Sequence, residues 1–245
     1  MEKFLQNKVV VITGAGDGLG RQIALDVAND GAKVVLVSRT EEKLKKLKNE
    51  ILNTGGEAEY YVCDISKLSE VGDISKKILG MYKNVDILIN NAGVYFEGST
   101  VDIDENKTKK MIEINTLGTI YVSKAFLPNM MDKNSGQILN VISVAGVEAG
   151  EEYTLYTASK FAITGFTEAL RKELMKTKIK VSAIYPEGIK TNIFAASGGL
   201  DYSKEEPQML MDPKDVSGVV LFMLKQPVDV NLSRVDIKKK VLKEE

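Results

Sequence analysis

Five short runs of aliphatic residues recur along the chain, and within them apolar side chains follow one another without in–out alternation. These runs occupy residues 9–12, 34–37, 87–89, 138–142 and 181–184. Continuous apolar runs of this length are typical of strands covered on both faces, as in a parallel sheet. Stretches of helical length separate them, at about 18–29, 41–53, 67–81, 104–131 and 155–176. The alternation limits the chain to α/β architectures in which helices connect parallel strands.

Signals at the ends of the expected helices agree with this pattern. Residues 30–31 and 53–56 supply glycines for helix C-termini, and Thr40 is a plausible helix start. The least regular stretch, around 197–213, is interpreted as a loop inside the domain. We therefore predict a single-domain α/β fold over residues 1–245. It is a Rossmann-type, doubly wound parallel sheet of about seven strands with helices on both faces.

The composition excludes several kinds of chemistry. The chain has no histidine, which excludes Ser-His-Asp hydrolases, Cys-His proteases and histidine-ligated zinc sites. The single cysteine, Cys63, excludes an intramolecular disulfide and thiolate metal sites held within one chain. We therefore expect no metal site, and any proton chemistry must use carboxylates, lysine or tyrosine.

Charge and hydropathy restrict the partners and the location. The 33 Lys and Arg residues nearly balance 34 Asp and Glu residues, so no net basic field attracts nucleic acid or anionic membranes. The lysine-rich stretches 43–48 and 238–240 are interpreted as solvated faces. The longest apolar run, 219–224, is far shorter than the roughly 20 residues of a membrane span. Residues 1–6 lack the apolar core of a secretory signal. We expect a cytoplasmic protein that binds neither nucleic acid nor membrane.

A glycine-rich turn follows the first apolar run, with the sequence TGAGDGLG at residues 13–20. Glycine lets the backbone turn tightly and approach a diphosphate, and the next helix presents free N–H groups there. The strict spacing G-x-G-x-x-G fails because Leu19 takes its last position. The spacing T-G-x-x-x-G-x-G fits, using Gly14, Gly18 and Gly20. The turn indicates a dinucleotide site; the alternative is a tight connection without a ligand.

The end of the second apolar run suggests which dinucleotide binds. An acidic residue at this position meets the adenosine ribose of NAD. Here the position holds Ser38, and Arg39 comes next. A guanidinium without a neighbouring carboxylate suits the 2′-phosphate of NADP through charge-assisted hydrogen bonds. The sequence therefore favours NADP (NADPH) over NAD; the alternative is that Arg39 is only a solvated residue before a helix.

A tyrosine and a lysine, Tyr156 and Lys160, lie one turn apart in a strongly helical stretch. Their spacing places both side chains on one helix face. Lowering a tyrosine pKa by about 3 units requires roughly 4 kcal/mol of differential stabilisation. One cation at about 4–5 Å supplies roughly 3–4 kcal/mol at an effective dielectric near 20. The lysine, helped by an oxidised nicotinamide, is thus about sufficient, and Tyr156 is a candidate general acid–base.

Taken together, these pieces resemble the short-chain dehydrogenase/reductase family over nearly the full chain. The matching residues, in the family's order, are Thr13, Gly14, Gly18, Gly20, Asp64, Asn90, Asn91, Ala92, Gly93, Asn115, Ser143, Tyr156 and Lys160. The resemblance implies that Tyr156 is the catalytic acid–base and that Ser143 hydrogen-bonds the reacting carbonyl oxygen. Lys160 would hold the nicotinamide ribose and depress the pKa of the tyrosine. Asn115 would lie at a distortion of the 104–131 helix and position a water in a proton relay.

The resemblance also implies where the cofactor lies. Asp64 and Ile65 would contact the adenine, while Ile189 and Thr191 would meet the carboxamide and phosphate side. Asn90 would either line the adenosine side or only support the central strand. The expected cofactor contacts are Thr13, Gly14, Gly18, Leu19, Gly20, Ser38, Arg39, Asp64, Ile65, Asn91, Ala92, Gly93, Tyr156, Lys160, Ile189 and Thr191.

Two positions depart from the family pattern. Pro186 is followed by Glu187, where family members usually have glycine. This carboxylate either tunes substrate choice or points to solvent. Asp17 stands where many NADP-dependent members carry a basic residue, which leaves Arg39 to favour NADP.

The C-terminal stretch 211–237 is similar to the branch of NADP-dependent 3-hydroxy acid (serine-type) dehydrogenases and related aldehyde reductases. We expect an NADP-dependent oxidoreductase acting on the hydroxyl or carbonyl group of a small substrate. The alternatives are a 3-ketoacyl-type reductase and a non-catalytic NAD(P)-binding sensor or scaffold.

A substrate loop is expected around 192–212, beyond the carboxyl end of a strand. Candidate lining residues are Tyr95, Glu148, Tyr153 and Phe194. Family members usually assemble, and small residues at 158, 162 and 165 leave one face of the 155–176 helix smooth. We therefore expect a homodimer or homotetramer; a contact within the chain would leave the same pattern.

Overall fold

The strands pair side by side in one parallel sheet. The computed structural model describes residues 3–151, 153–193 and 209–240. In these residues the strand order is β3-β2-β1-β4-β5-β6-β7, which confirms the expected sheet of about seven strands. The strands are β1 Val9–Thr13, β2 Lys33–Ser38, β3 Glu57–Val62, β4 Ile87–Asn90, β5 Gly136–Val141, β6 Ile179–Pro186 and β7 Arg234–Ile237.

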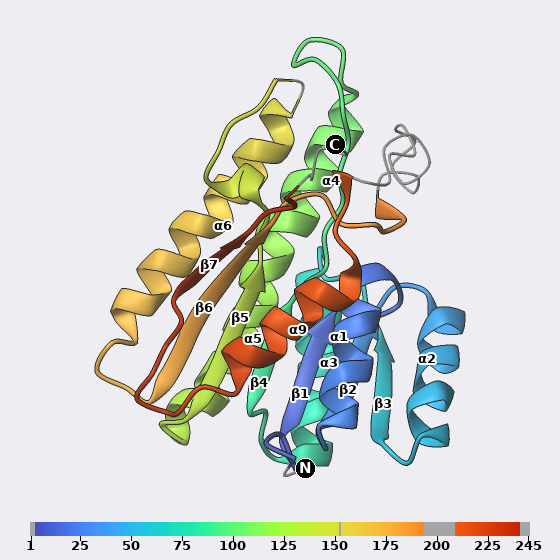
Figure 1. The fold of residues 1–245 in the computed structure, drawn as a ribbon, viewed down its shortest axis with the longest axis vertical. Coiled ribbons are helices and arrows are strands. Elements are labelled where there is room, and N and C mark those ends of the chain that lie inside the picture. Colours follow the sequence, from blue (N-terminus) through green and yellow to red (C-terminus); the bar gives the residue numbers. More distant parts are fainter. Residues whose placement is uncertain (1–2, 152, 194–208, 241–245) are drawn as a thin grey trace, which may run out of the picture.

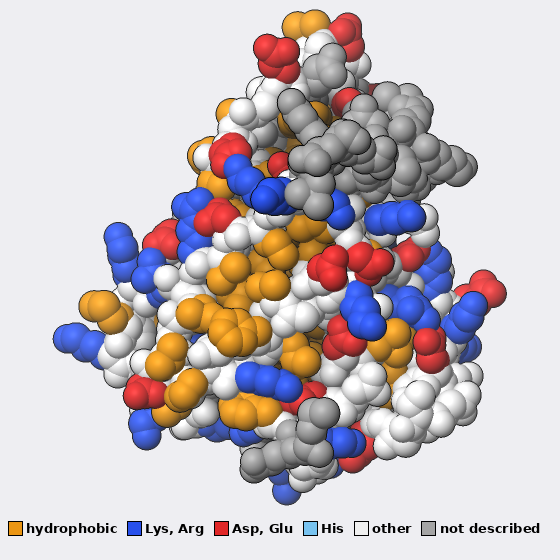
Figure 2. Space-filling model, viewed as in Figure 1, with side chains coloured by type: hydrophobic (Ala, Val, Ile, Leu, Met, Phe, Trp, Pro, Cys, Tyr) orange, Lys and Arg blue, Asp and Glu red, His pale blue; other side chains and the backbone are white. Residues whose placement is uncertain are grey.

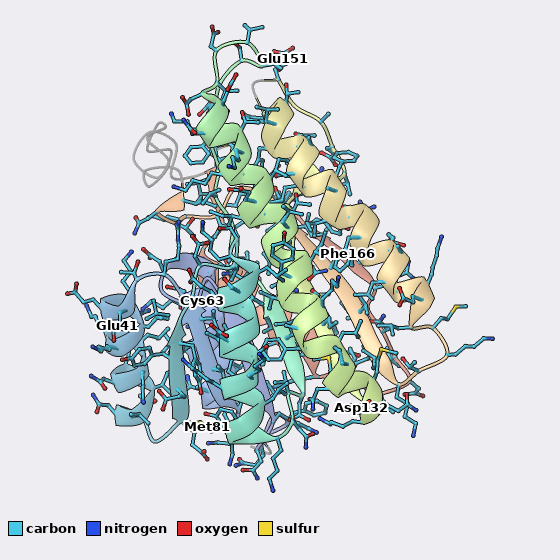
Figure 3. The ribbon with its side chains drawn as sticks, turned by 180° about the vertical axis from the view of Figure 1, so that it is seen from behind. Glu41, Cys63, Met81, Asp132, Glu151 and Phe166 are labelled. Atoms are coloured by element: carbon cyan, nitrogen blue, oxygen red, sulfur yellow. The ribbon has the colours of Figure 1, made fainter. Side chains whose placement is uncertain are left out.

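Helices cover both faces of the sheet, so the molecule has three layers (Figure 1). The helices are α1 Gly18–Asn29, α2 Glu41–Asn53, α3 Leu68–Tyr82, α4 Glu105–Met111, α5 Thr119–Asp132, α6 Thr154–Glu173 and α9 Pro213–Leu224. One apolar core joins the sheet to α1, α2 and α9, and a second joins it to α3, α5 and α6. Figure 3, seen from behind, shows α3, α5 and α6 side by side over the second face.

The central strands are apolar on both sides because both sides are covered. In β1, Val10 and Ile12 pack in the core with α1 and α9, whereas Val9 and Val11 pack in the core with α3 and α5. Val10, Val11 and Ile12 are fully buried. This two-sided burial explains the continuous apolar runs of the sequence and confirms their interpretation as parallel strands.

Three elements lie outside the runs from which the strands and helices were predicted. Strands β3 and β7 are the two edges of the sheet and stay partly exposed, so their sequences carry no long apolar run. Helix α9 begins at Pro213, which the sequence analysis assigned to a loop. The Asp212 carboxylate accepts the Lys214 N–H at 2.8 Å, an ordinary helix N-cap. Most of the expected loop, residues 194–208, lies outside the described residues.

The apolar run 219–224 belongs to α9, where Val220 and Leu224 are buried in the core. Among the described helices, none combines the length and the apolar character needed to cross a membrane.

The stretch predicted as one helix over 104–131 contains a distortion. Between α4 and α5, residues Ile112–Gly118 form a π-helical segment, which includes Asn115. Such bulges insert a residue into the helical ladder and re-aim the side chains near it. The expected distortion at Asn115 is confirmed.

Candidate active site

The order of the strands reverses between β1 and β4, and this is where an open α/β sheet forms a crevice. The loops that follow these two strands are tied together. The Asn91 side chain donates to the carbonyl oxygens of Thr13 and Gly14, at 3.1 and 3.3 Å. The backbone N–H groups of Asn91 and Ala92 both donate to the Thr13 hydroxyl, at 3.0 and 3.1 Å. These contacts fix the glycine-rich turn against the end of β4.

A cleft of about 750 Å³ opens beside this junction and borders a smaller hollow of about 170 Å³. Predicted site residues that line the cleft are Gly14, Gly18, Leu19, Arg39, Asn91, Ala92, Gly93, Ser143, Tyr156, Lys160, Ile189 and Thr191. Ser38, Asp64 and Ile65 line the smaller hollow, together with Arg39. The structure thus brings together residues from nearly the whole length of the chain along one continuous surface.

The glycine turn leaves no room for side chains. Gly14 and Gly18 have φ values of 66° and 50°, which glycine adopts readily. A Cβ on Gly18 would lie 2.9 Å from the Thr191 methyl group, and a Cβ on Gly20 would lie 2.3 Å from the Gly14 carbonyl oxygen. Helix α1 begins at the cleft, where Gly18 and Leu19 line it, so the positive end of its dipole lies nearby. A dinucleotide diphosphate fits this arrangement.

Two of the predicted cofactor contacts also have a structural role. Thr13 is 1% exposed and its hydroxyl holds the loop after β4, while Gly20 packs against the Gly14 backbone. Direct cofactor contact at these two positions stays a prediction. Asn90 is buried and donates to Ser123 and Asn140, which favours the interpretation that it supports the central strands.

A second cation, missed in the sequence, lies near Arg39. Lys43, on the first turn of α2, lines both the cleft and the smaller hollow. Its ammonium is 2.5 Å from the Asp17 carboxylate, which also accepts the Gly18 N–H at 2.8 Å. Burial opposes ionisation of Asp17, yet hydrogen bonds from Lys43, Asn192 and Gly18 hold its pKa below the usual value. The sequence does contain a signal for this second cation, because Lys43 follows Arg39 by four residues at the start of a helix.

Ser143, Tyr156 and Lys160 meet where the end of β5 approaches α6. The Lys160 ammonium lies 5.5 Å from the centre of the Tyr156 ring. The Ser143 hydroxyl oxygen accepts the Ala145 N–H at 3.2 Å, which leaves its hydrogen free to donate. Ser143 also hydrogen-bonds the Tyr156 side chain. One cleft therefore holds a proton donor (Tyr156), a second hydrogen-bond donor (Ser143) and a cation (Lys160).

The protonation of the pair differs from the sequence-based expectation. Desolvation raises the pKa of Tyr156 to about 12, against the opposing effect of the hydrogen bond with Ser143. Burial also lowers the pKa of Lys160 to about 8, which disfavours the cation that was expected to acidify the phenol. In the protein alone, desolvation disfavours both charged forms. That Lys160 and a bound oxidised nicotinamide together lower the pKa of the tyrosine stays a prediction.

Ser143 has a strained backbone. Its φ and ψ are 154° and 158°, a region that is essentially reserved for glycine. Such a conformation costs on the order of 1–3 kcal/mol and persists only where the surroundings enforce it. In this conformation the serine side chain, at the end of β5, hydrogen-bonds the tyrosine on α6.

Asn115 is 2% exposed and lies behind the cleft wall. Its carboxamide accepts the Val94 N–H at 2.8 Å and donates to the Val94 carbonyl oxygen at 2.9 Å. It also donates to the Ser159 hydroxyl at 3.1 Å, one residue before Lys160. The side chain therefore joins the loop after β4 to α6. A water relay at Asn115 stays a prediction.

The residues that were predicted from the sequence to contact the substrate also belong to this cleft. Tyr95, Glu148 and Tyr153 line it as expected, whereas Phe194 lies outside the described residues. Glu187 also lines the cleft, and its carboxylate accepts the Lys239 backbone N–H at 2.9 Å. This residue therefore anchors the chain after β7, a role that neither expectation for it included.

Known proteins share this sequence and fold. The family model described as short chain dehydrogenase matches residues 8–198. An uncharacterized oxidoreductase of Staphylococcus saprophyticus is 36% identical over 235 residues, which cover 96% of this chain and 98% of that protein.

Solved structures agree in fold over almost the full length. An alcohol dehydrogenase from the archaeon Thermococcus sibiricus, complexed with 5-hydroxy-NADP, has a TM-score of 0.88 at 27% identity and covers 98% of this chain and 100% of its own. The closed form of a serine dehydrogenase complexed with NADP⁺ has a TM-score of 0.87 at 27% identity, covering 94% of both chains. The likeness to these two enzymes does not favour the serine-type branch over other dehydrogenases.

Proposed function

The chain belongs to the short-chain dehydrogenase family and is an oxidoreductase, and on this premise we propose that it interconverts a carbonyl and a hydroxyl group of a small substrate with Tyr156 as the acid–base. The observation that carries the proposal is one cleft that joins the glycine turn of β1 and α1 to Ser143, Tyr156 and Lys160. A bound nicotinamide dinucleotide supplies the hydride and, when oxidised, a positive charge.

The residues of the cleft divide into those that hold the cofactor and those that act on the substrate. Gly14, Gly18 and the N-terminus of α1 would hold the diphosphate, and Asp64 and Ile65 would border the adenine. Ile189 and Thr191, which line the same cleft, would meet the carboxamide and phosphate side of the cofactor. Asn192 and Leu210, from the two described ends of the segment 192–212, line the cleft and would contact the substrate.

Ser143 and Tyr156 would hydrogen-bond the same substrate oxygen. The serine hydroxyl, whose oxygen accepts the Ala145 N–H, would turn its hydrogen from Tyr156 to the substrate carbonyl and orient it, and the phenol proton would then pass to the same oxygen. Because the pKa of Tyr156 is raised to about 12, the phenol is protonated throughout the neutral range. A protonated phenol is able to serve as the proton donor in carbonyl reduction.

NADP is the proposed cofactor. Support comes from Ser38 and Arg39, because the end of β2 itself carries no acidic residue, and from Lys43 beside them, which pairs with Asp17. The structural neighbours that were solved with NADP agree with this preference. Replacing Arg39 by Asp should reverse the preference for NADPH over NADH in binding titrations. An unchanged ratio of dissociation constants would place the discrimination elsewhere.

The test of the catalytic proposal is the oxidation of NADPH, followed at 340 nm over a panel of aldehydes and ketones. Tyr156→Phe should reduce kcat at least 10³-fold while NADPH still binds, because the ring remains and only the proton donor is lost. Full activity in this variant would refute the assigned acid–base. Tight NADPH binding without turnover of any carbonyl by the parent protein would favour a cofactor-binding sensor.

We also propose that the chain assembles into a homodimer or homotetramer. Figure 2 shows apolar side chains gathered in the middle of the face that carries α9 and β7 in Figure 1. Phe222 on α9 and Val228 beyond it are 61% and 63% exposed. Contiguous exposed apolar surface of this kind is typical of an association site. Sedimentation equilibrium tests the proposal, and a monomer at micromolar concentration would refute it.

A further inference from the structure

Three tyrosines form an aromatic cluster at the substrate end of the cleft. The ring of Tyr95 meets the ring of Tyr156 edge to face, with centroids 5.0 Å apart and an interplanar angle of 82°. On its other side, Tyr95 lies 6.1 Å from the ring of Tyr153. Tyr95 is 5% exposed, whereas Tyr153 is 37% exposed although it lines the cleft. Tyr95 thus connects the proposed acid–base to an aromatic ring that is open to a ligand.

The remaining side chains around this cluster are mainly apolar. Described apolar residues lining the same cleft are Val94, Phe96, Ile142, Val144, Ala149, Ile193 and Leu210. Most ligand pockets are built in this way, with a few polar groups that fix the orientation of the ligand. Here the polar groups are Ser143 and the Tyr156 phenol, which would take the reacting oxygen.

The charged groups at this end do not select an anionic substrate. Besides Asp17 at the glycine turn, the carboxylates of Glu148 and Glu187 line the cleft. Glu148 pairs with Lys238 at 2.6 Å, and Glu187 accepts a backbone N–H of the same C-terminal segment. The Lys110 ammonium also lines the cleft and lies over the ring of Phe96, 5.9 Å from its centre. Lys160 lines the cleft as well, so charges of both signs are present, whereas the tyrosine cluster itself carries no charge and suits an uncharged group.

We propose that the substrate carries an uncharged apolar or aromatic group next to its reacting carbonyl, and that Tyr153 and Tyr95 bind this group. The inference rests on the proposed function, because it takes the oxygen position from Ser143 and Tyr156. It differs from the small hydroxy acid that the resemblance to serine-type dehydrogenases implies. An aryl group beside the carbonyl would reach Tyr95 directly, since this ring already touches the proposed proton donor.

The test compares three aldehydes of different character with NADPH: benzaldehyde, propanal and succinic semialdehyde. We expect kcat/KM for benzaldehyde to exceed that for the semialdehyde at least tenfold. Tyr153→Ala should raise KM for benzaldehyde about tenfold with kcat within twofold, because a binding surface is lost and the proton donor is kept. KM for propanal should change less than twofold, and Tyr153→Phe should behave as the parent.

Phe4→Ala is a matched control, since Phe4 is another exposed aromatic residue, near the start of β1 and away from the carboxyl ends of the strands. This variant should have the same kcat and KM as the parent for all three aldehydes. Two outcomes would overturn the inference: a preference of the parent for succinic semialdehyde, or an equal change in KM for all three aldehydes in Tyr153→Ala. If Tyr156→Phe is inactive, either outcome leaves the proposed function standing. If Tyr156→Phe keeps full activity, or the parent reduces none of the aldehydes, the proposed function fails together with the inference.

Discussion

The buried ammonium of Lys160 makes the folded protein less stable than it would be without this charge. The side chain is 7% exposed, and burial lowers its pKa from 10.5 to about 8. Between these two values the folded protein binds fewer protons than the unfolded chain, so the free energy of unfolding increases as the pH rises. Below pH 8 Lys160 is protonated in both the folded and the unfolded state, so the full destabilisation by the buried charge applies. A drop from 10.5 to about 8 corresponds to about 3 kcal/mol at 1.36 kcal/mol per pKa unit.

Replacing Lys160 by methionine removes the charge and keeps an unbranched side chain of similar length. The ammonium also attracts the Tyr156 ring at 5.5 Å, which is worth on the order of 1 kcal/mol and is lost in the variant. We therefore expect Lys160→Met to be more stable than the parent by about 2 kcal/mol at pH 7. This gain should shrink as the pH rises above 8 and vanish near pH 10, while activity is lost at every pH.

Urea unfolding of the cofactor-free protein at pH 6.5, 7.5, 8.5 and 9.5 measures this difference. Lys124→Met is the matched control, because Lys124 is an exposed lysine within α5. Its free energy of unfolding should stay within about 0.5 kcal/mol of the parent at each pH. A Lys160→Met variant that is less stable than the parent by the same amount at pH 6.5 and 9.5 would refute the reasoning, since the ammonium would then be held favourably.

Three further predictions concern the backbone, two at positions of the site and one on α3. Ser143→Gly relieves the φ of 154° and should be about 1–2 kcal/mol more stable than Ser143→Ala in urea unfolding, although both variants lose the hydroxyl and its activity. Equal stability of these two variants would show that the position is not strained. Gly20→Ala places a Cβ 2.3 Å from the Gly14 carbonyl oxygen, so it should lower the melting temperature and weaken NADPH binding. Gly72→Ala, where a Cβ on α3 meets nothing within 4 Å, should instead stabilise the protein by about 0.5–1 kcal/mol.

The central part of the fold could be predicted because its strands are covered on both sides. Burial on both faces requires apolar residues at every position, and this leaves a signal that needs no alignment. The edge strands carry a weaker signal for the same reason. Strand β3, Glu57–Val62, is partly exposed along its length and alternates charged and apolar residues at its start. Helix α9 was missed although Asp212-Pro213 is an ordinary helix start, because the neighbouring prolines and glycines suggested a loop.

The positions of the candidate site could be predicted better than their chemical state. The spacing of Tyr156 and Lys160 places both side chains on one helix face. It also allows an estimate of the attraction between the ammonium and the phenolate. It does not give the desolvation of either group, which depends on side chains from other elements. Tyr95, in the loop after β4, packs against the phenol from 61 residues away in the sequence. The pKa of Tyr156 is therefore set by tertiary packing that no local pattern contains.

Departures from ordinary local rules gather at the cleft. Ser143 has a backbone suited to glycine, Asn115 interrupts a helix with a π-helical segment, and Lys160 is a buried cation. Each is unfavourable for folding on its own. Two large apolar cores, one on each face of the sheet, hold these features in place. Since removing the strain at Ser143 or the charge of Lys160 should stabilise the chain, folding does not explain either feature. Variants that gain stability while losing activity would thus support the assignment of the site before any substrate is known.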